Sequence, residues 1–216
     1  MTAERTQGFF HQYADDFDAI YSNRTGLFNG VVNNLFRTSM KLRFRKTIEG
    51  CYPIEGKTIL DVGCGPGHYA ITLAQRGAAH VQGIDFADGM LRIAAEHAGK
   101  AGVRNRCDFG IADFSTYSAA APFDYVIVMG FMDYIADPRK IVEKVISLTR
   151  SKAFLSFPRS GGLLAWQRQI RYRKRCDLFL YNREQLDQLF SSFPQVKATI
   201  EPIARDFFVT LTRTDL

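Results

Sequence analysis

Features that define several classes of protein are missing from this chain of 216 residues. No stretch approaches the roughly 20 apolar residues of a membrane-spanning helix, and the longest apolar runs, such as residues 125–129, are short. The first residues, MTAERTQGFFHQYADDF, include acidic side chains and no long apolar core, so we expect no signal peptide. Repeats and low-complexity segments are absent too. The sequence therefore favours a cytoplasmic globular protein.

Cysteine and histidine are few and scattered. The four cysteines, at positions 51, 64, 107 and 176, have no CxxC spacing, which predicts reduced thiols and not a disulfide framework. The four histidines, at positions 11, 68, 80 and 97, show no metal-ligand spacing. We therefore expect no metal.

Excess positive charge is confined to one segment. The formal net charge is +6, and residues 151–180 contain seven Lys or Arg against one acid, Asp177. Within about 160–176, a helical pattern places Leu163, Trp166 and Ile170 on one face and most arginines around the other. An acidic small molecule, an anionic lipid surface, RNA or plain solvation would each suit this basic insertion. No RNA-binding domain is appended, so we do not expect nucleic acid as the partner.

Strands and helices are predicted to alternate from residue 57 onward. The strands are expected at 57–62, 79–84, 107–111, 123–129 and 153–157. The helices are expected at 67–76, at 88–98 with Asp88 as N-cap, and at 137–148 with Pro138 in first position. Two further strand-like runs, 196–203 and 206–213, are joined by only a few residues, so they can pair only as antiparallel strands. This order indicates an α/β protein with a doubly wound, mostly parallel sheet.

The residues before this pattern, 1 to about 50, are predicted to be helical. Apolar and aromatic positions recur three and four residues apart, among them Phe10, Tyr13, Phe17 and Tyr21. A second helical stretch is expected from about 27 to 49. These helices are an addition to the alternating pattern.

A glycine-rich turn follows the first predicted strand, in LDVGCGPGHYA at residues 60–70. Glycine costs roughly 0.5–1 kcal/mol in regular structure, so three alternating glycines, Gly63, Gly65 and Gly67, imply that the backbone needs unusual freedom. In open parallel sheets, ligands bind beyond the carboxyl ends of the strands, where a helix start offers free N–H groups. A plain turn needs only one or two glycines. The pattern favours a nucleotide-type cofactor.

The glycines alone leave an NAD-dependent oxidoreductase open. Gly65-x-Gly67-x-x-Ala70 matches the dinucleotide fingerprint. Pro66 removes an N–H donor between the glycines, and the Asp61 carboxylate would repel a pyrophosphate but suits a cationic ligand. The chain also leaves little room for a separate substrate domain.

Four motifs together resemble the class I S-adenosylmethionine-dependent methyltransferases. They are Asp61-x-Gly63-x-Gly65-x-Gly67, Gly83-Ile-Asp85-Phe86, Ala112-Asp113-Phe114 and the run 123–129, covering about residues 57–150. The chain is similar in particular to the small-molecule branch that contains magnesium-protoporphyrin, quinone and sugar O-methyltransferases. This resemblance implies a Rossmann-like, doubly wound, mostly parallel seven-stranded sheet with its last strand antiparallel. It also implies a helical lid over residues 1–50 and a cofactor-binding domain over 51–216.

The resemblance further implies how the cofactor, S-adenosylmethionine, is held. Asp61 would face its ammonium group, Asp85 would accept from both ribose hydroxyls, and Asp113 would accept from the adenine amino group. The full set of implied cofactor-binding residues is Asp61, Gly63, Cys64, Gly65, Gly67, Asp85, Phe86, Met90, Asp113, Phe114, Met129 and Gly130. For the two later aspartates an ordinary role at a strand end stays open, and for the two phenylalanines a role in the core.

The acceptor side leaves more alternatives. Methyl transfer can rely on positioning, and a general base helps only if the acceptor loses a proton. The candidate bases are His11, Tyr13, Tyr21, Asp133 and Tyr134, each with packing or capping as its alternative. Arg43 and Trp166 are expected on the substrate side, although Arg43 would equally suit a solvated helix face.

The resemblance implies a small-molecule acceptor, methylated at oxygen, for which we expect acidic or amphipathic character. Peripheral contact with a membrane surface is a further expectation from the basic insertion. A non-catalytic or RNA-binding use of the same fold, through residues 151–180, is the remaining alternative.

Overall fold

The computed structural model describes residues 30–161 and 178–214, with only the backbone described for residues 30–37. The strands are β1 (Thr58–Val62), β2 (His80–Asp85), β3 (Cys107–Ile111), β4 (Phe123–Val128), β5 (Thr149–Pro158), β6 (Val196–Ile203) and β7 (Asp206–Arg213). The helices are α3 (Gly30–Gly50), α4 (His68–Gln75), α5 (Asp88–Lys100), α6 (Pro138–Ser147) and α8 (Arg183–Ser191), with short 3-10 turns η1 (Arg104–Arg106) and η2 (Met132–Tyr134).

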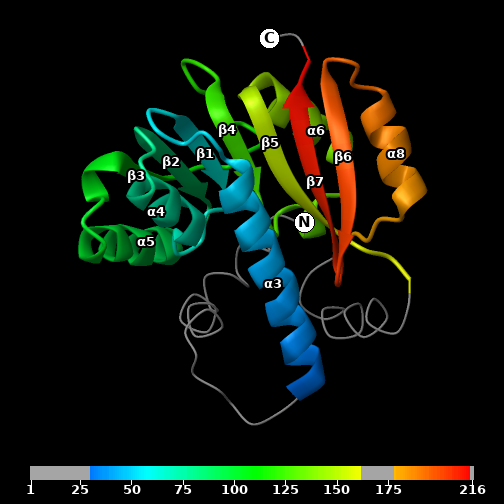
Figure 1. Ribbon diagram of the computed structural model, residues 1–216, viewed down its shortest axis with the longest axis horizontal. Coiled ribbons are helices and arrows are strands. Elements are labelled where there is room, and N and C mark those ends of the chain that lie inside the picture. Colours follow the sequence, from blue (N-terminus) through cyan, green and yellow to red (C-terminus); the bar gives the residue numbers. More distant parts are fainter. Residues whose placement is uncertain (1–29, 162–177, 215–216) are drawn as a thin grey trace.

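The strands form one seven-stranded sheet in the order β3-β2-β1-β4-β5-β7-β6 (Figure 1). Strands β1 to β5 are parallel to one another, and β7 lies between β5 and β6 and is antiparallel to both. The predicted sheet, with its last strand reversed, is confirmed. The chain runs outward from β1 to β3 and then crosses to β4 on the other side of β1. The switch point, where ligands bind in such sheets, therefore lies between the ends of β1 and β4.

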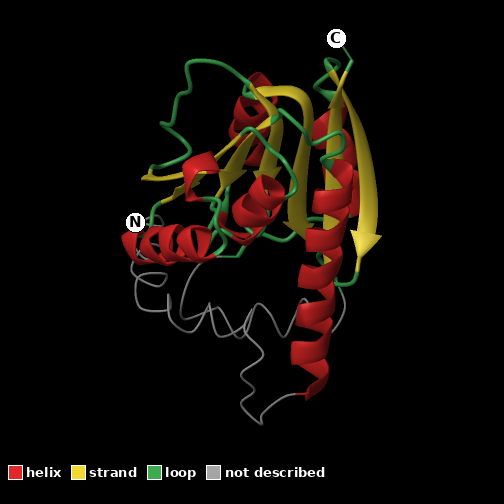
Figure 2. Ribbon diagram, turned by 60° about the vertical axis from the view of Figure 1, so that its left-hand side comes forward, coloured by secondary structure: helices red, strands yellow, loops and turns green. Residues whose placement is uncertain are grey.

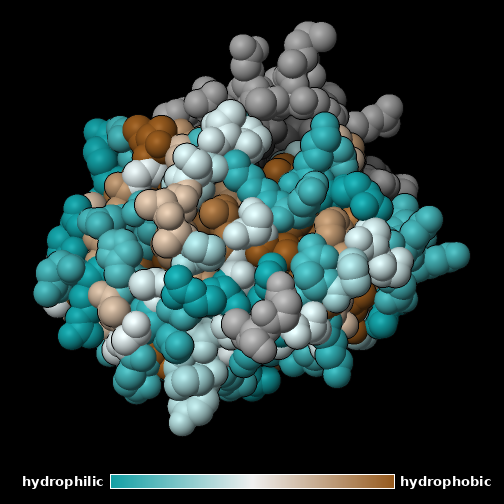
Figure 3. Space-filling view, turned by 90° about the horizontal axis from the view of Figure 1, so that it is seen from above, coloured by the Kyte–Doolittle hydropathy of each residue, from teal (hydrophilic) through white to brown (hydrophobic). Residues whose placement is uncertain are grey.

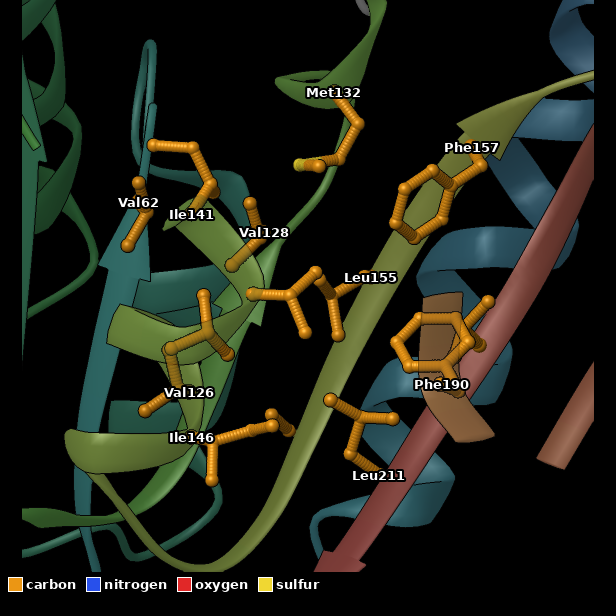
Figure 4. Close-up of a cluster of buried hydrophobic side chains, with 14 of the residues drawn as sticks. Val62, Val126, Val128, Met132, Ile141, Ile146, Leu155, Phe157, Phe190 and Leu211 are labelled. Atoms are coloured by element: carbon orange, nitrogen blue, oxygen red, sulfur yellow. The ribbon is translucent and has the colours of Figure 1, made fainter. Parts of the chain in front are cut away.

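Helices cover both faces of the sheet. On one face, strand residues such as Val126, Val128 and Leu155 pack against Ile141 of α6 and Phe190 of α8 (Figure 4). On the other face, the neighbouring β4 residues Tyr125 and Ile127 pack with side chains from α3, α4 and α5. Because successive side chains of a strand point to opposite faces, β4 contributes to both cores and is buried throughout.

Helix α3 is long and runs beside the sheet (Figure 2). In both ribbon views, its first half projects beyond the edge at which the parallel strands end. Its C-terminal half contacts α4 and β6. Among the described residues, no helix has the length and apolar character needed to cross a bilayer.

The structure contains a helix, α8, that the sequence analysis does not predict. A reciprocal capping box starts it: the Gln185 amide donates to the Asn182 side chain, and the Asn182 amide donates to the Gln185 side chain, each at 2.8 Å. An Asn followed three residues later by Gln is a recognisable helix start. Leu186 and Phe190 then bury the helix against the sheet. Strand β5 is also longer than predicted, beginning at Thr149.

The start of α5 corrects another prediction. Asp88 is not the N-cap: Ala87 occupies that position, with no side-chain cap, and Asp88 is the first helical residue. The Asp85 carboxylate accepts a hydrogen bond from the Ala87 amide at 2.9 Å. This bond fixes the backbone at Ala87, one residue before Asp88. Asp88 instead pairs with Arg92 at 3.2 Å on the surface.

Two glycines with opposite surroundings give a first prediction. An added Cβ at Gly83 would lie 2.7 Å from Phe109 and 3.0 Å from the Cys64 sulfur, whereas at Gly99, within α5, it would meet no described residue within 4 Å. We expect Gly83→Ala to lower the free energy of unfolding by about 1–3 kcal/mol through overpacking. Gly99→Ala should raise it by about 0.5–1 kcal/mol. Urea unfolding measures both, and a neutral Gly83→Ala would contradict the packing described.

Candidate functional site

The turn after β1 is fastened to the end of β2. The amides of Gly63 and Cys64 both donate to the Ile84 carbonyl, at 2.8 and 3.1 Å, and the Gly65 amide donates to the Asp85 carboxylate at 3.0 Å. These bonds hold the turn at the switch point, at the edge where the parallel strands end. The opposite edge, seen in Figure 3, is largely hydrophilic, with only small hydrophobic areas between the polar ones.

The three glycines of this turn adopt left-handed conformations, with φ of 66°, 51° and 80° at Gly63, Gly65 and Gly67. Residues with a Cβ atom rarely adopt such angles, so the backbone conformation of the turn explains why these three positions are glycine. An added Cβ would lie 3.0 Å from Ala94 at Gly67 and 3.3 Å from Phe131 at Gly63, but at Gly65 it would meet no atom of the described residues within 4 Å. Gly63 and Gly67 thus allow neighbouring side chains to pack closely on the turn, and Gly65 leaves its backbone open to a ligand.

Asp61, on β1 beneath this turn, is buried, with 2% of its surface exposed. Within the described part of the chain, its Oδ2 atom is buried and has no hydrogen-bond partner. Burial raises the pKa of Asp61 to about 7; the Ala70 amide lowers it and the charge of Asp85 raises it. A buried carboxylate oxygen without a partner is costly, and a cationic ligand would relieve that cost. The site therefore fits an ammonium group and disfavours a phosphate.

Asp85 organises the turn from the end of β2. One carboxylate oxygen accepts from the Gly65 amide and the other from the Ala87 amide, at 3.0 and 2.9 Å. A carboxylate has about four acceptor positions, more than these two amides use. The strand-end role left open by the sequence is present, and it is compatible with the role of ribose acceptor.

Asp113 and Phe114 follow β3 and face different surroundings. Asp113 is exposed, and its carboxylate accepts from the Ser115 amide at 2.8 Å, as in an ordinary turn. Phe114 is buried and packs edge-to-face on Phe131, with ring centroids 5.9 Å apart. The ring of Phe114 thus belongs to the core, whereas Asp113 is accessible.

The remaining predicted cofactor residues differ in exposure. Phe86 and Met129 are half-buried, whereas Met90 and Cys64 are buried. Burial, together with the charges of Asp61 and Asp85, raises the pKa of the Cys64 thiol well above its ordinary value. Cys64 is therefore a neutral packing residue of the turn, and not a nucleophile.

Arg43 does not lie on a solvated helix face; that alternative is wrong. Only 9% of its surface is exposed. Its Nη1 donates to Ser156 Oγ at 3.1 Å and lies 3.6 Å from Asp206 Oδ2. Ser156 Oγ also accepts from the amide of Gly130 at 2.8 Å. Arg43 thus lies beside the turn after β4, at one end of the candidate site.

Of the candidate bases, the structure describes Asp133 and Tyr134, both on η2 shortly after β4. Asp133 is buried and Tyr134 is half-buried. Burial raises the pKa of the nearby Tyr181 to about 12, with further increases from the charges of Asp133 and Asp137. The other candidates, His11, Tyr13 and Tyr21, lie outside the described residues, as do Trp166 and most of the basic insertion.

Sequence reasoning missed Ser156 and Asp206 as neighbours of the site. Both are buried polar residues, on β5 and β7. The available signal was the polar spacing within the predicted helix, where Ser39, Arg43 and Thr47 recur every four residues. It indicates polar partners on the sheet without identifying them.

Residues 54–186 match the family described as "Methyltransferase domain". The ubiquinone biosynthesis O-methyltransferase of Neisseria meningitidis serogroup C is 36% identical over 112 residues, covering 51% of this chain and 47% of that protein. The enzyme of the same name from Maricaulis maris is 36% identical over 91 residues, covering 42% and 35%. The chain thus spans about half or less of the length of these relatives.

Solved structures agree at the level of the fold. The magnesium protoporphyrin IX methyltransferase from Synechocystis PCC 6803 with bound SAH superposes with a TM-score of 0.79 and 18% identity, covering 96% of this chain and 98% of that one. The DhpI–SAH complex gives a TM-score of 0.68 and 13% identity, covering 99% and 97%. Together with the family match over more than half of the chain, these findings show that the chain belongs to the S-adenosylmethionine-dependent methyltransferases with the class I fold.

Proposed function

We propose that this protein transfers a methyl group from S-adenosylmethionine to an oxygen atom of a small-molecule acceptor. The observation that carries this proposal is the buried oxygen of Asp61, which has no hydrogen-bond partner among the described residues and lies beneath an open glycine turn. It suits a cofactor with an ammonium group. A dinucleotide would bring its pyrophosphate to the same turn, near a buried carboxylate that has no ion pair with any described residue.

The proposed contacts follow the ends of the strands. The open backbone at Gly65 would lie against the cofactor, Asp61 would pair with its ammonium group, and Asp85 would accept from the ribose hydroxyls. Asp113 would accept from the adenine amino group, and the turn at Gly130 would line the methionine end. The cofactor supplies a methyl group on an activated sulfonium. The protein's contribution is then to orient the two reactants and exclude water.

The acceptor is proposed in less detail. Relatives named as ubiquinone biosynthesis O-methyltransferases support transfer to oxygen. A hydroxyl acceptor needs a base, and Asp133 and Tyr134 are the described candidates. The charge of residues 151–180 supports an acidic or amphipathic acceptor and contact with a membrane surface. A lid over residues 1–50 and a cytoplasmic location are part of the same proposal.

Calorimetry tests the cofactor half of the proposal. S-adenosylhomocysteine should bind with a micromolar dissociation constant, about −8 kcal/mol, and NADH should bind far more weakly. A folded protein that prefers NADH would contradict the proposal and favour the oxidoreductase. Transfer of labelled methyl from S-adenosylmethionine, screened across phenols, quinols, porphyrins, carboxylates and sugars, would identify the acceptor.

A further inference from the structure

The face of α3 that packs on the sheet contains a stripe of buried polar residues. Ser39, Arg43 and Thr47 lie four residues apart, so they share one side of the helix. All three are buried, with at most 9% of their surface exposed. A helix that covers a sheet normally presents an apolar stripe, and burying a guanidinium is costly unless it is paired. The partners of this stripe therefore indicate what it does.

Those partners form a continuous chain of polar contacts across the sheet. Ser39 Oγ donates to Asp206 Oδ2 at 2.9 Å, and the same oxygen lies 3.6 Å from Arg43 Nη1. Arg43 Nη1 also donates to Ser156 Oγ at 3.1 Å, and Ser156 Oγ accepts from the Gly130 amide at 2.8 Å. The chain begins on α3 and ends on the backbone of the turn after β4, which lines the proposed cofactor site.

The last of these contacts sets the orientation of one peptide. Gly130 has a φ of 73°, and the peptide between Met129 and Gly130 is trans. In a trans peptide the N–H and C=O point in opposite directions. The Gly130 N–H points to Ser156 on β5, and β4 lies between β5 and β1. The Met129 carbonyl consequently points away from Ser156, and β1, with Asp61 and the glycine turn, lies on the side of β4 away from β5.

We infer that Arg43, Ser156 and Asp206 are positioning residues that hold the Met129–Gly130 peptide with its carbonyl facing the cofactor. This inference rests on the proposed function. Asp206 and Ser39 orient Arg43, Arg43 orients the Ser156 hydroxyl, and that hydroxyl fixes the peptide. A buried ion pair adds little net stability compared with well-packed apolar side chains, so anchoring α3 does not by itself account for it.

The test compares S-adenosylhomocysteine binding by the full chain and its variants. Wild-type protein is titrated first: no binding there would overturn the proposed function and the inference with it, whereas normal binding by wild type makes the variants a test of the positioning role alone. We expect Ser156→Ala and Arg43→Met each to weaken binding about tenfold, because the peptide loses its orienting partner. Arg43→Lys, which keeps the charge, should recover part of the affinity. The matched control is Lys46→Met, which breaks a second ion pair between α3 and the sheet, to Glu201 at 2.9 Å, and should change affinity by less than about twofold.

A double variant separates positioning from anchoring. Arg43→Met leaves Asp206 buried without its guanidinium, which destabilises the fold; adding Asp206→Asn removes that charge and should restore much of the urea midpoint. Affinity should stay low, because Ser156 still lacks Arg43. If affinity returns together with the midpoint, or if Ser156→Ala binds as tightly as Lys46→Met, the residues only anchor α3 and the inference is wrong.

Discussion

Alanine in place of Asp85 is expected to weaken S-adenosylhomocysteine binding by about 100-fold while the sheet stays folded. A hydrogen bond from a ribose hydroxyl to a carboxylate contributes roughly 1.5 kcal/mol at the lower end of its range, so the loss of two such bonds sets this scale. The substitution also removes the acceptors of the Gly65 and Ala87 amides, so the turn loses part of its own support. Calorimetric titration measures the affinity, and urea unfolding shows whether the fold persists.

A second ligand distinguishes the two effects of this substitution. The 2′-deoxy form of S-adenosylhomocysteine lacks one hydroxyl, so wild type should bind it more weakly than the parent compound. If Asp85 contacts the diol, Asp85→Ala should bind both ligands almost equally. If the variant still binds the parent compound more tightly than the 2′-deoxy form, by the same factor as wild type, Asp85 acts only through the turn. Asp88→Ala, which removes the same charge from an exposed ion pair three residues later, is the control and should leave binding unchanged.

Local patterns were sufficient to predict the sheet. Apolar strands such as β1 and β4 are buried along almost their whole length, which is what their sequences predict for a sheet covered on both faces. The glycine turn was predictable as well, because left-handed φ angles restrict the residue type directly. Asp137 accepts from the Arg139 amide and Pro138 follows it, so the start of α6 was also predictable.

What the sequence did not reveal depends on contacts between distant residues. Asp88 has the residue type of a helix cap, but the chain is fixed one residue earlier by Asp85. Arg43 resembles a solvated arginine until its partners, 113 and 163 residues away at Ser156 and Asp206, are brought to it by the sheet. No local pattern encodes such pairs. Helix α8 differs, because its start has a local sequence signal, the Asn182–Gln185 capping box.

Replacing Asp61 with asparagine is expected to act in opposite directions on stability and on binding. The pKa of this carboxyl is raised by burial from its ordinary value of 3.8 to about 7. For an acid whose folded pKa is raised, the free energy of unfolding falls as pH rises from about 4 to about 7 and stays low above that. Asparagine cannot ionise, so at pH 8 the ligand-free variant should be more stable than wild type by up to about 4 kcal/mol.

Binding should change in the other direction. The ammonium group of the cofactor requires the ionised carboxylate, so wild-type affinity for S-adenosylhomocysteine should fall about tenfold per pH unit below pH 7. Asp61→Asn should bind about 100-fold more weakly than wild type at pH 7.5 and lose most of this pH dependence. Titrations at pH 5.5, 6.5 and 7.5 measure both. The neighbouring Cys64 thiol does not interfere, because its pKa is raised well above this range.

Asp124, at the start of β4, supplies the matched control. Burial acts to raise its pKa, but hydrogen bonds from Thr58 and the charge of Lys57 outweigh that effect and hold it below its ordinary value. Its contribution to stability is therefore present above about pH 4 and lost as pH falls. Asp124→Asn should destabilise the protein at pH 8 and leave cofactor affinity unchanged. If Asp61→Asn instead destabilises the ligand-free protein at pH 8, the buried carboxylate has a partner within the fold, and its assignment to the ammonium group is wrong.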